Sequence, residues 1–286
     1  MKRITKVLSF VLALVCLCAF PVGASAANVE DATIDYTKTG SLTLYKYDLT
    51  SATEAGVWDS SSYVSTGQYD QSILDAMNPY AIQGVEFSYI RLADITTYDN
   101  SANNAHEVIT LYAFEESDAS AAFLSAIGLS YSDAFLSESG FHYYRSHDLT
   151  TALATALNTN ATTVKDALES FVSENGGTAM TVTDEYGHSE AAGLELGLYL
   201  VVETKVPENV TVTCNPFLVS LPMTTIDGSE WNYDISVSKQ WRHNHGQNYY
   251  TRENSGIQRA LDLRRKRRGH PGEIYPGCPR LLCFCG

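Results

Sequence analysis

Basic side chains are scarce over most of this 286-residue chain. Between residues 28 and 240 there are 30 acidic residues against seven lysines and arginines, which gives a net charge of −23. A nucleic-acid-binding protein needs a basic surface to neutralise phosphates, so this composition excludes that class. Apolar residues make up 44% of the chain, which is enough for a packed core and excludes global disorder.

Motifs of common catalytic and cofactor sites are also missing. The sequence has no G-x-S-x-G, H-E-x-x-H, phosphate-binding P-loop or G-x-G-x-x-G pattern, and no spacing typical of an EF-hand calcium loop. We therefore predict no enzyme activity, no cofactor and no metal site. A secreted hydrolase, which would need a nucleophile and a base, finds no support in these residues.

Cysteine is nearly absent from the acidic part of the chain. Of the six cysteines, two lie near the N-terminus and three near the C-terminus, which leaves Cys214 alone in the acidic body. A single cysteine cannot form an internal disulfide. The domain must therefore depend on its core or on another covalent device.

The first 26 residues have the pattern of a secretory signal peptide. Lys2, Arg3 and Lys6 precede an apolar run over residues 7–20, and Ala24-Ser25-Ala26 forms a small-residue cleavage site. A transmembrane anchor is the alternative, but the run is shorter than the roughly 20 residues that span a bilayer. We expect cleavage before Ala27 and export of the remaining chain.

Residues 27–240 show strand patterns at both ends and helical patterns between them. Polar and apolar residues alternate, or β-branched and aromatic residues gather, in segments 41–48, 84–90, 108–113, 197–204, 209–213, 216–221 and 231–237. Helical patterns cover residues 119–129, 152–157 and 162–172, with Asp148 as an N-cap candidate and Gly176-Gly177 as the C-terminal stop. This order predicts a mainly β fold, a β-sandwich with inserted α-helices, and not a parallel βαβ sheet.

Three segments in this order resemble the N-terminal domain of sortase-assembled major pilins, the fimbrial shaft subunits of Gram-positive bacteria. They are residues 38–47 (KTGSLTLYKY), 197–207 (GLYLVVETKVP) and 231–237 (WNYDISV), the last after 216–222 (PFLVSLP). The resemblance covers roughly residues 30–238 and implies an Ig-like, CnaB-type sandwich. It also implies a structural subunit of a cell-wall pilus on the cell surface, with a pilin-specific sortase, neighbouring pilin subunits and a host surface as partners.

In this family a sortase joins the C-terminus of one subunit to a lysine of the next. That lysine belongs to a Tyr-Pro-Lys-Asn-type motif at the end of the domain, and Lys239 is the candidate here. The sequence reads Val237-Ser238-Lys239-Gln240, one residue shorter than the family pattern and without its proline. An ordinary lysine of the tail is the alternative reading.

Relatives also carry internal Lys–Asn isopeptide bonds that form beside a buried acid. The resemblance assigns Lys46 as the lysine and Glu203 as the acid. Burial favours the neutral amine and the neutral acid, which is the state that attack on an amide requires. Gln240 stands where relatives can have the asparagine. The alternative for Lys46 is a strand lysine whose stem is buried and whose ammonium reaches water.

Residues 221–225 (LPMTT) match the form of an LPxT sorting signal. No apolar span followed by basic residues comes directly after them, and in the family this stretch ends a strand. We therefore predict a strand end here and not a sorting signal.

Residues 241–286 differ in composition from the body. They hold nine basic and three acidic residues, including a run of five basic residues from Arg264 to Arg268. Moving the reading frame by one base turns residues 241–254 into a string rich in Thr and Lys codons, as a pilin would have there. We therefore expect this segment to be an aberrant, disordered tail produced by a frameshift near residues 237–240.

The combined prediction is a secreted, non-enzymatic pilus shaft subunit that ends after its N-terminal domain. A cell-surface adhesin that binds a host glycan or protein through the helical insertion is the alternative. Covalent subunit ladders would favour the pilin, and ligand binding by a monomer would favour the adhesin.

Overall fold

Two β-sheets share one hydrophobic core in the computed structural model. The structure describes residues 33–59, 70–99, 108–208, 210, 213–224 and 230–239. The predicted signal peptide and the basic tail lie outside these residues. Within them, no helix is both long enough and apolar enough to cross a membrane.

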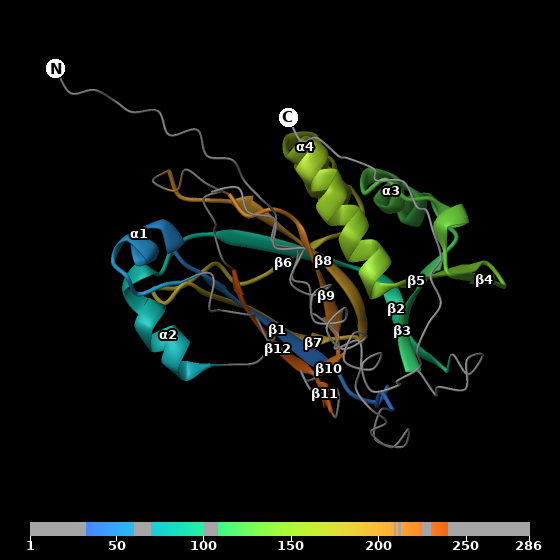
Figure 1. Ribbon diagram of the computed structural model, residues 1–286, viewed down its shortest axis with the longest axis horizontal. Helices are drawn as coiled ribbons and strands as arrows, with labels where there is room; N and C mark the ends of the chain where they lie inside the picture. Colours follow the sequence, from blue (N-terminus) through green and yellow to red (C-terminus); the bar gives the residue numbers. More distant parts are fainter. Residues whose placement is uncertain are drawn as a thin grey trace, which may run out of the picture. The chain divides into compact units, whose positions relative to one another are not determined.

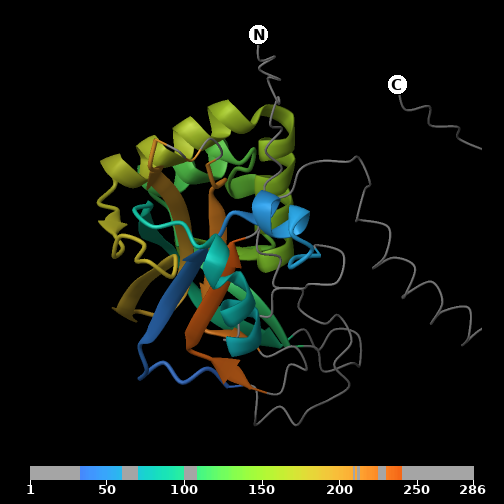
Figure 2. The same cartoon turned by 90° about the vertical axis from the view of Figure 1, so that its left-hand side faces the viewer.

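The smaller sheet joins the two ends of the domain. It has the order β12-β1-β7, with β1 at Gly40–Lys46, β7 at His188–Leu194 and β12 at Asp234–Lys239. β12 runs parallel to β1 and β7 runs antiparallel to it, and Figure 2 shows β1 and β12 side by side. Leu42 pairs with Ile235 and Leu44 with Val237, and all four side chains are buried. Apolar residues at every second position therefore anchor this sheet to the core.

The larger sheet has the order β4-β5-β3-β2-β8-β9, and β6 also pairs with β2. Its strands are β2 (Glu86–Asp99), β3 (Val108–Glu115), β4 (Leu136–Glu138), β5 (Phe141–Arg145), β6 (Thr178–Ala179), β8 (Gly197–Lys205) and β9 (Phe217–Leu221). A short two-stranded sheet joins β10 (Met223–Thr224) to β11 (Trp231–Asn232). The long strand β2 pairs with β8 along its first half and with β3 along its second half.

Helices α3 (Asp118–Ala126) and α4 (Ser146–Glu174) pack against each other and against the larger sheet (Figure 1). Leu149, Leu153, Leu168 and Val172 of α4 are buried in the core at helical spacing. The backbone of Asn160 is not helical, and its side chain accepts from the Thr163 N–H at 3.3 Å. α4 is thus two helices joined at a kink, which agrees with the two separate helical patterns in the sequence.

Two short helices form a satellite cluster beyond the end of β1. α1 (Leu49–Glu54) and α2 (Gln71–Met77) begin at Asp48 and Asp70, whose carboxylates accept backbone N–H groups of the first turn. A 3₁₀ turn, η1 (Asn78–Tyr80), follows α2, and a second, η3 (Tyr131–Asp133), precedes β4. The buried residues of the satellite cluster are Tyr45, Tyr47, Leu49, Ala52, Trp58, Leu74 and Met77.

The predicted fold class, mainly β with inserted helices, is confirmed, but several boundaries were wrong. The strand expected over 84–90 extends to Asp99 because β3 supplies a second set of backbone partners. The expected N-cap Asp148 lies inside α4, which begins at Ser146 after Arg145. Most of the strand expected over 209–213 lies outside the described residues, and Thr213 is not in a strand. The expected end of α4 is confirmed: Gly176 has φ +81°, and the Gly177 N–H binds the Val172 carbonyl at 2.8 Å.

Candidate functional site

Lys46 is the last residue of β1, and its side chain is completely buried. Its Nζ lies 2.5 Å from Oε2 of Glu203, and both side chains have an exposed fraction of 0%. This geometry rejects the alternative of a lysine whose ammonium reaches water. The structure thus brings together the two residues that the sequence analysis assigned to one site.

Glu203 is buried because β8 has the core on both of its faces. Every residue from Gly197 to Glu203 is buried, and Thr204 is the first exposed residue of the strand. Leu198 lines a cavity beside α4, and alternate residues of a strand point to opposite faces. Glu203 therefore lies on the face opposite to Leu198, where it meets Lys46 of the smaller sheet.

The second carboxylate oxygen of Glu203 has a partner of its own. Oε1 accepts the backbone N–H of Cys214 at 2.7 Å. Cys214 is a buried residue in the segment that leads into β9. Each oxygen of the carboxylate is thus engaged, which is the condition under which a buried charge is tolerated.

The backbone of Lys239 lies beside Lys46, because the two residues pair in the parallel ladder of β12 and β1. The side chain of Lys239 is outside the described part of the structure, and so is all of Gln240. Whether Lys239 receives a sortase link, and whether a bond forms inside the domain, stay predictions.

The sequence that matches LPxT is a buried strand end, as predicted. Leu221 is the last residue of β9, and Met223 begins β10. The exposed fractions of Leu221 and Met223 are only 1% and 4%, so these two side chains are buried in the folded domain.

Helix α4 contributes a second lysine and glutamate that the sequence analysis did not identify. Lys165 Nζ binds Oγ1 of Thr213 and lies 3.5 Å from Oε1 of Glu169. Burial raises the pKa of Glu169, and the positive charge of Lys165 partly opposes that shift, while the charge of Glu203 adds to it. The spacing of Lys165 and Glu169 in the sequence, one helical turn, was the available signal.

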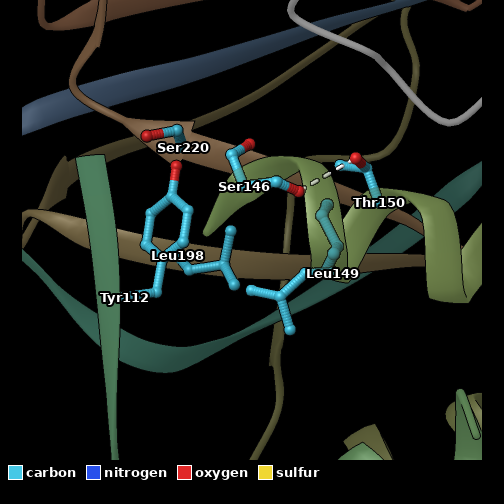
Figure 3. Close-up of a pocket in the computed structure, with 7 residues that line it drawn as sticks. Tyr112, Ser146, Leu149, Thr150, Leu198 and Ser220 are labelled. Carbon is cyan, nitrogen blue, oxygen red and sulfur yellow. Dashed lines mark hydrogen bonds between the residues drawn. The ribbon is translucent and has the colours of Figure 1, made fainter. Parts of the chain in front are cut away.

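Residues of helix α4 line two hollows in the described part of the domain. The first is an internal cavity of about 10 Å³ between α4 and the larger sheet, lined by Tyr112, Ser146, Leu149, Thr150, Leu198, Leu218 and Ser220 (Figure 3). Thr150 turns its hydroxyl to the Ser146 carbonyl at 2.9 Å, as Figure 3 shows. A volume of this size holds one water molecule at most, so it is a packing feature.

The second cavity is an open surface depression of about 690 Å³ between the end of α3 and the first half of α4. Small, polar and apolar residues line it, among them Ala126, Leu129, Ala152 and Thr155. Among the residues that the structure describes, no three His, Cys, Asp or Glu side chains are grouped so that they could hold a metal ion.

The Lys46–Glu203 pair has the parts of an amide-forming site. A neutral lysine amine is a nucleophile, and a neutral carboxylic acid can protonate a carboxamide and so promote loss of ammonia. Transfer of one proton from the ammonium to the carboxylate produces both neutral forms at once. In this domain the pair connects β1 of the smaller sheet to β8 of the larger one.

The comparison with family models identifies the class directly. Residues 37–237 match the model described as Gram-positive pilin subunit D1, N-terminal domain. The chain therefore belongs to this pilin family. No curated protein matches the sequence.

Solved pilin structures are also similar to the chain. The major pilin SpaD from Corynebacterium diphtheriae is 21% identical, with a TM-score of 0.37, over 73% of this chain and 33% of that one. The SpaA pilin in its signal-peptide complex, from the same organism, is 13% identical, with a TM-score of 0.33, over 72% of this chain and 99% of that one. The group B streptococcus pilus 2b backbone protein is 12% identical, with a TM-score of 0.28, over 73% and 42%. The chain thus spans about a third of the length of the SpaD structure.

Proposed function

We propose that this chain is the N-terminal domain of a pilus shaft subunit that a pilin-specific sortase joins to its neighbour through Lys239. The observation that carries the proposal is the family match over residues 37–237, which ends just before Lys239. The pairing of β12 with β1 supports it, because it ties the end of the domain to its first strand. The subunit is structural, is exported by its signal peptide and acts on the cell surface with other pilin subunits.

The chemistry of the link needs a lysine that acts as an acyl acceptor. The sortase cleaves the Thr–Gly bond of an LPxTG segment and holds the threonine as an acyl-enzyme. The neutral amine of Lys239 attacks this acyl group, and the enzyme leaves as the new amide forms.

The chain itself can serve as the acceptor in a test. It is incubated with a pilin-specific sortase and an LPxTG peptide, and adducts are located by tandem mass spectrometry. We expect one adduct on Lys239, lost in Lys239→Ala and kept in Lys205→Ala, which removes an exposed lysine of β8. Absence of an adduct, or an adduct that persists in Lys239→Ala, would refute the assignment.

We also propose that Lys46 and Glu203 form the internal cross-linking site of the domain. The Lys46 amine would attack the side-chain carboxamide of Gln240, with Glu203 as the proton shuttle. A new amide would form and one ammonia would leave. Complete burial of both side chains and their 2.5 Å separation support this role. The intact mass of the chain tests it. A cross-linked chain is lighter than its own sequence mass by one ammonia, whereas the Glu203→Ala variant should have the mass calculated from its own sequence.

A second candidate function is adhesion. The depression between α3 and α4 lies on the helical insertion, where a host ligand could bind. Ligand capture by the monomer that is lost on Ala152→Trp, combined with no Lys239 adduct, would favour an adhesin over a shaft subunit.

A further inference from the structure

The short segment before β9 connects two lysines that lie in different parts of the domain. On one side the Cys214 N–H donates to Glu203 Oε1 at 2.7 Å, and the other oxygen of Glu203 faces Lys46. On the other side the hydroxyl of Thr213, the preceding residue, is bound by Lys165 Nζ of α4. Lys165 is therefore connected to Lys46 through a short chain of contacts: Thr213, the next residue Cys214, and the Glu203 carboxylate.

Burial and a second partner on α4 also restrict the Lys165 side chain. Its side chain has an exposed fraction of only 19%, and Glu169 lies 3.5 Å away, one turn further along α4. The charge of Glu203 contributes to the raised pKa of Glu169, behind burial, which comes first. The two lysine–glutamate pairs thus belong to one electrostatic neighbourhood, separated by the 213–214 backbone.

An ordinary helix-surface pair would not need this arrangement. A Lys–Glu pair one turn apart on a helix is satisfied by the helix alone and stabilises it only slightly. Here the ammonium also holds a hydroxyl that is 48 residues away in the chain. That contact fixes the backbone whose next N–H binds the buried acid.

We propose that Lys165 is a positioning residue for Glu203. By holding Thr213 it keeps the Cys214 N–H against Glu203 Oε1, which leaves Oε2 directed at Lys46. This inference rests on the proposed role of Glu203 as the acid of the cross-linking site. It assigns to α4, an inserted helix, a part in the covalent chemistry of the sandwich.

The test uses three variants of the whole chain and two local signals. Lys165→Met keeps most of the side-chain volume and removes the donor, Lys165→Arg keeps a charged donor, and Lys205→Met is the matched control at an exposed lysine paired with Glu86. The signals are hydrogen exchange of the Cys214 amide and the ¹³C shift of the Glu203 carboxyl, both read by NMR. The Val201 amide of β8 reports on the rest of the fold.

We expect Lys165→Met to speed Cys214 exchange about tenfold, as the loss of roughly one hydrogen bond would, and to move the Glu203 carboxyl signal. Val201 exchange should not change, Lys165→Arg should restore both signals, and Lys205→Met should leave them alone. The proposal fails if Lys165→Met leaves Cys214 and Glu203 unchanged. It also fails if Val201 exchange rises with them, because the effect is then a general loss of stability. These signals do not depend on sortase, so a missing Lys239 adduct would sink the proposed function without deciding this one.

Discussion

Lys46 and Glu203 join the two sheets of the domain through one fully buried ion pair. The lysine ends β1 of the smaller sheet and the glutamate lies near the end of β8 in the larger one, with 2.5 Å between Nζ and Oε2. Because neither side chain is exposed, solvent cannot replace either partner. The pair therefore controls stability in a way that exposed pairs of the same domain do not.

Removing one partner of this pair should be costly. All variants of this comparison carry Gln240→Ala, which blocks the proposed cross-link and keeps Lys46 in the ion pair. In that background Glu203→Gln leaves the Lys46 ammonium buried without its counter-charge, and we expect a loss of about 3–5 kcal/mol in the free energy of unfolding. The double variant Lys46→Met with Glu203→Gln should recover most of that loss, because no buried charge remains. Urea unfolding measures both values.

The exposed pair of Lys205 and Glu86 supplies the control. Its atoms are 2.7 Å apart, but the exposed fractions of the two side chains are 68% and 40%. Lys205→Met should cost less than about 1 kcal/mol. Equal losses at Lys205 and Glu203 would show that burial of the Lys46 pair has no energetic consequence.

Position 187 requires glycine because its backbone lies against the backbone of Lys46. Its φ is +72°, its carbonyl accepts the Lys46 N–H at 2.9 Å, and a Cβ at this position would overlap the Lys46 carbonyl oxygen. Gly187→Ala should therefore cost about 2–4 kcal/mol, from backbone strain and from overpacking together.

Gly140 separates these two effects. Its φ is +81° and a Cβ there would have no neighbour within 4 Å. Gly140→Ala should cost only about 1–2 kcal/mol, from the backbone conformation alone. Thermal unfolding of both variants is the measurement, and the same loss in each would contradict the steric argument.

Thr183 satisfies two backbone groups in the interior. Its hydroxyl accepts the Val85 N–H at 2.8 Å and donates to the Ile82 carbonyl at 2.8 Å. Thr183→Val keeps the shape but leaves both groups buried without a partner, so we expect a loss of about 2–3 kcal/mol. Thr183→Ser should lose about half as much. Thr159→Val, on the exposed side of α4, should stay within about 0.5 kcal/mol of the parent in the same urea titration.

Strands with strong apolar patterns could be predicted from the sequence, and strands that depend on partners could not. β1, β3, β8 and β9 have alternating or continuous apolar residues, and their ranges were found to within two residues. β7 is rich in small and polar residues, and it forms because its backbone pairs with β1. The polar second half of β2 depends in the same way on β3. Helices α1 and α2 are short, and their only local signals were the capping residues Asp48 and Asp70.

The candidate site was predictable only in part. Lys46 and Glu203 were paired through the resemblance to pilins, since no local pattern connects residues 157 apart. Lys165 and Thr213 gave no such signal, because their contact exists only once α4 has packed beside the start of β9. Charge counts indicated a lysine-poor domain but not which of its lysines are buried.

Glu169 should make the domain less stable as the pH rises. Burial raises its pKa above the usual 4.5, so the folded state holds this proton more tightly than the unfolded state does. The stability that this proton contributes is complete below 4.5 and is lost as the pH rises through the higher pKa of the folded state. Glu169→Gln cannot lose a proton, so it should be more stable than the parent at neutral pH, and the difference should shrink in acid. Asp133 gives the opposite sign: its hydrogen bonds with Ser130 lower its pKa from 3.8, so Asp133→Asn should be less stable than the parent at neutral pH, and that difference should close as the pH falls through the lowered value. Urea midpoints measured across this range decide the matter, and a Glu169→Gln variant that is less stable than the parent at neutral pH would show that the ion pair with Lys165 outweighs the burial of the carboxylate.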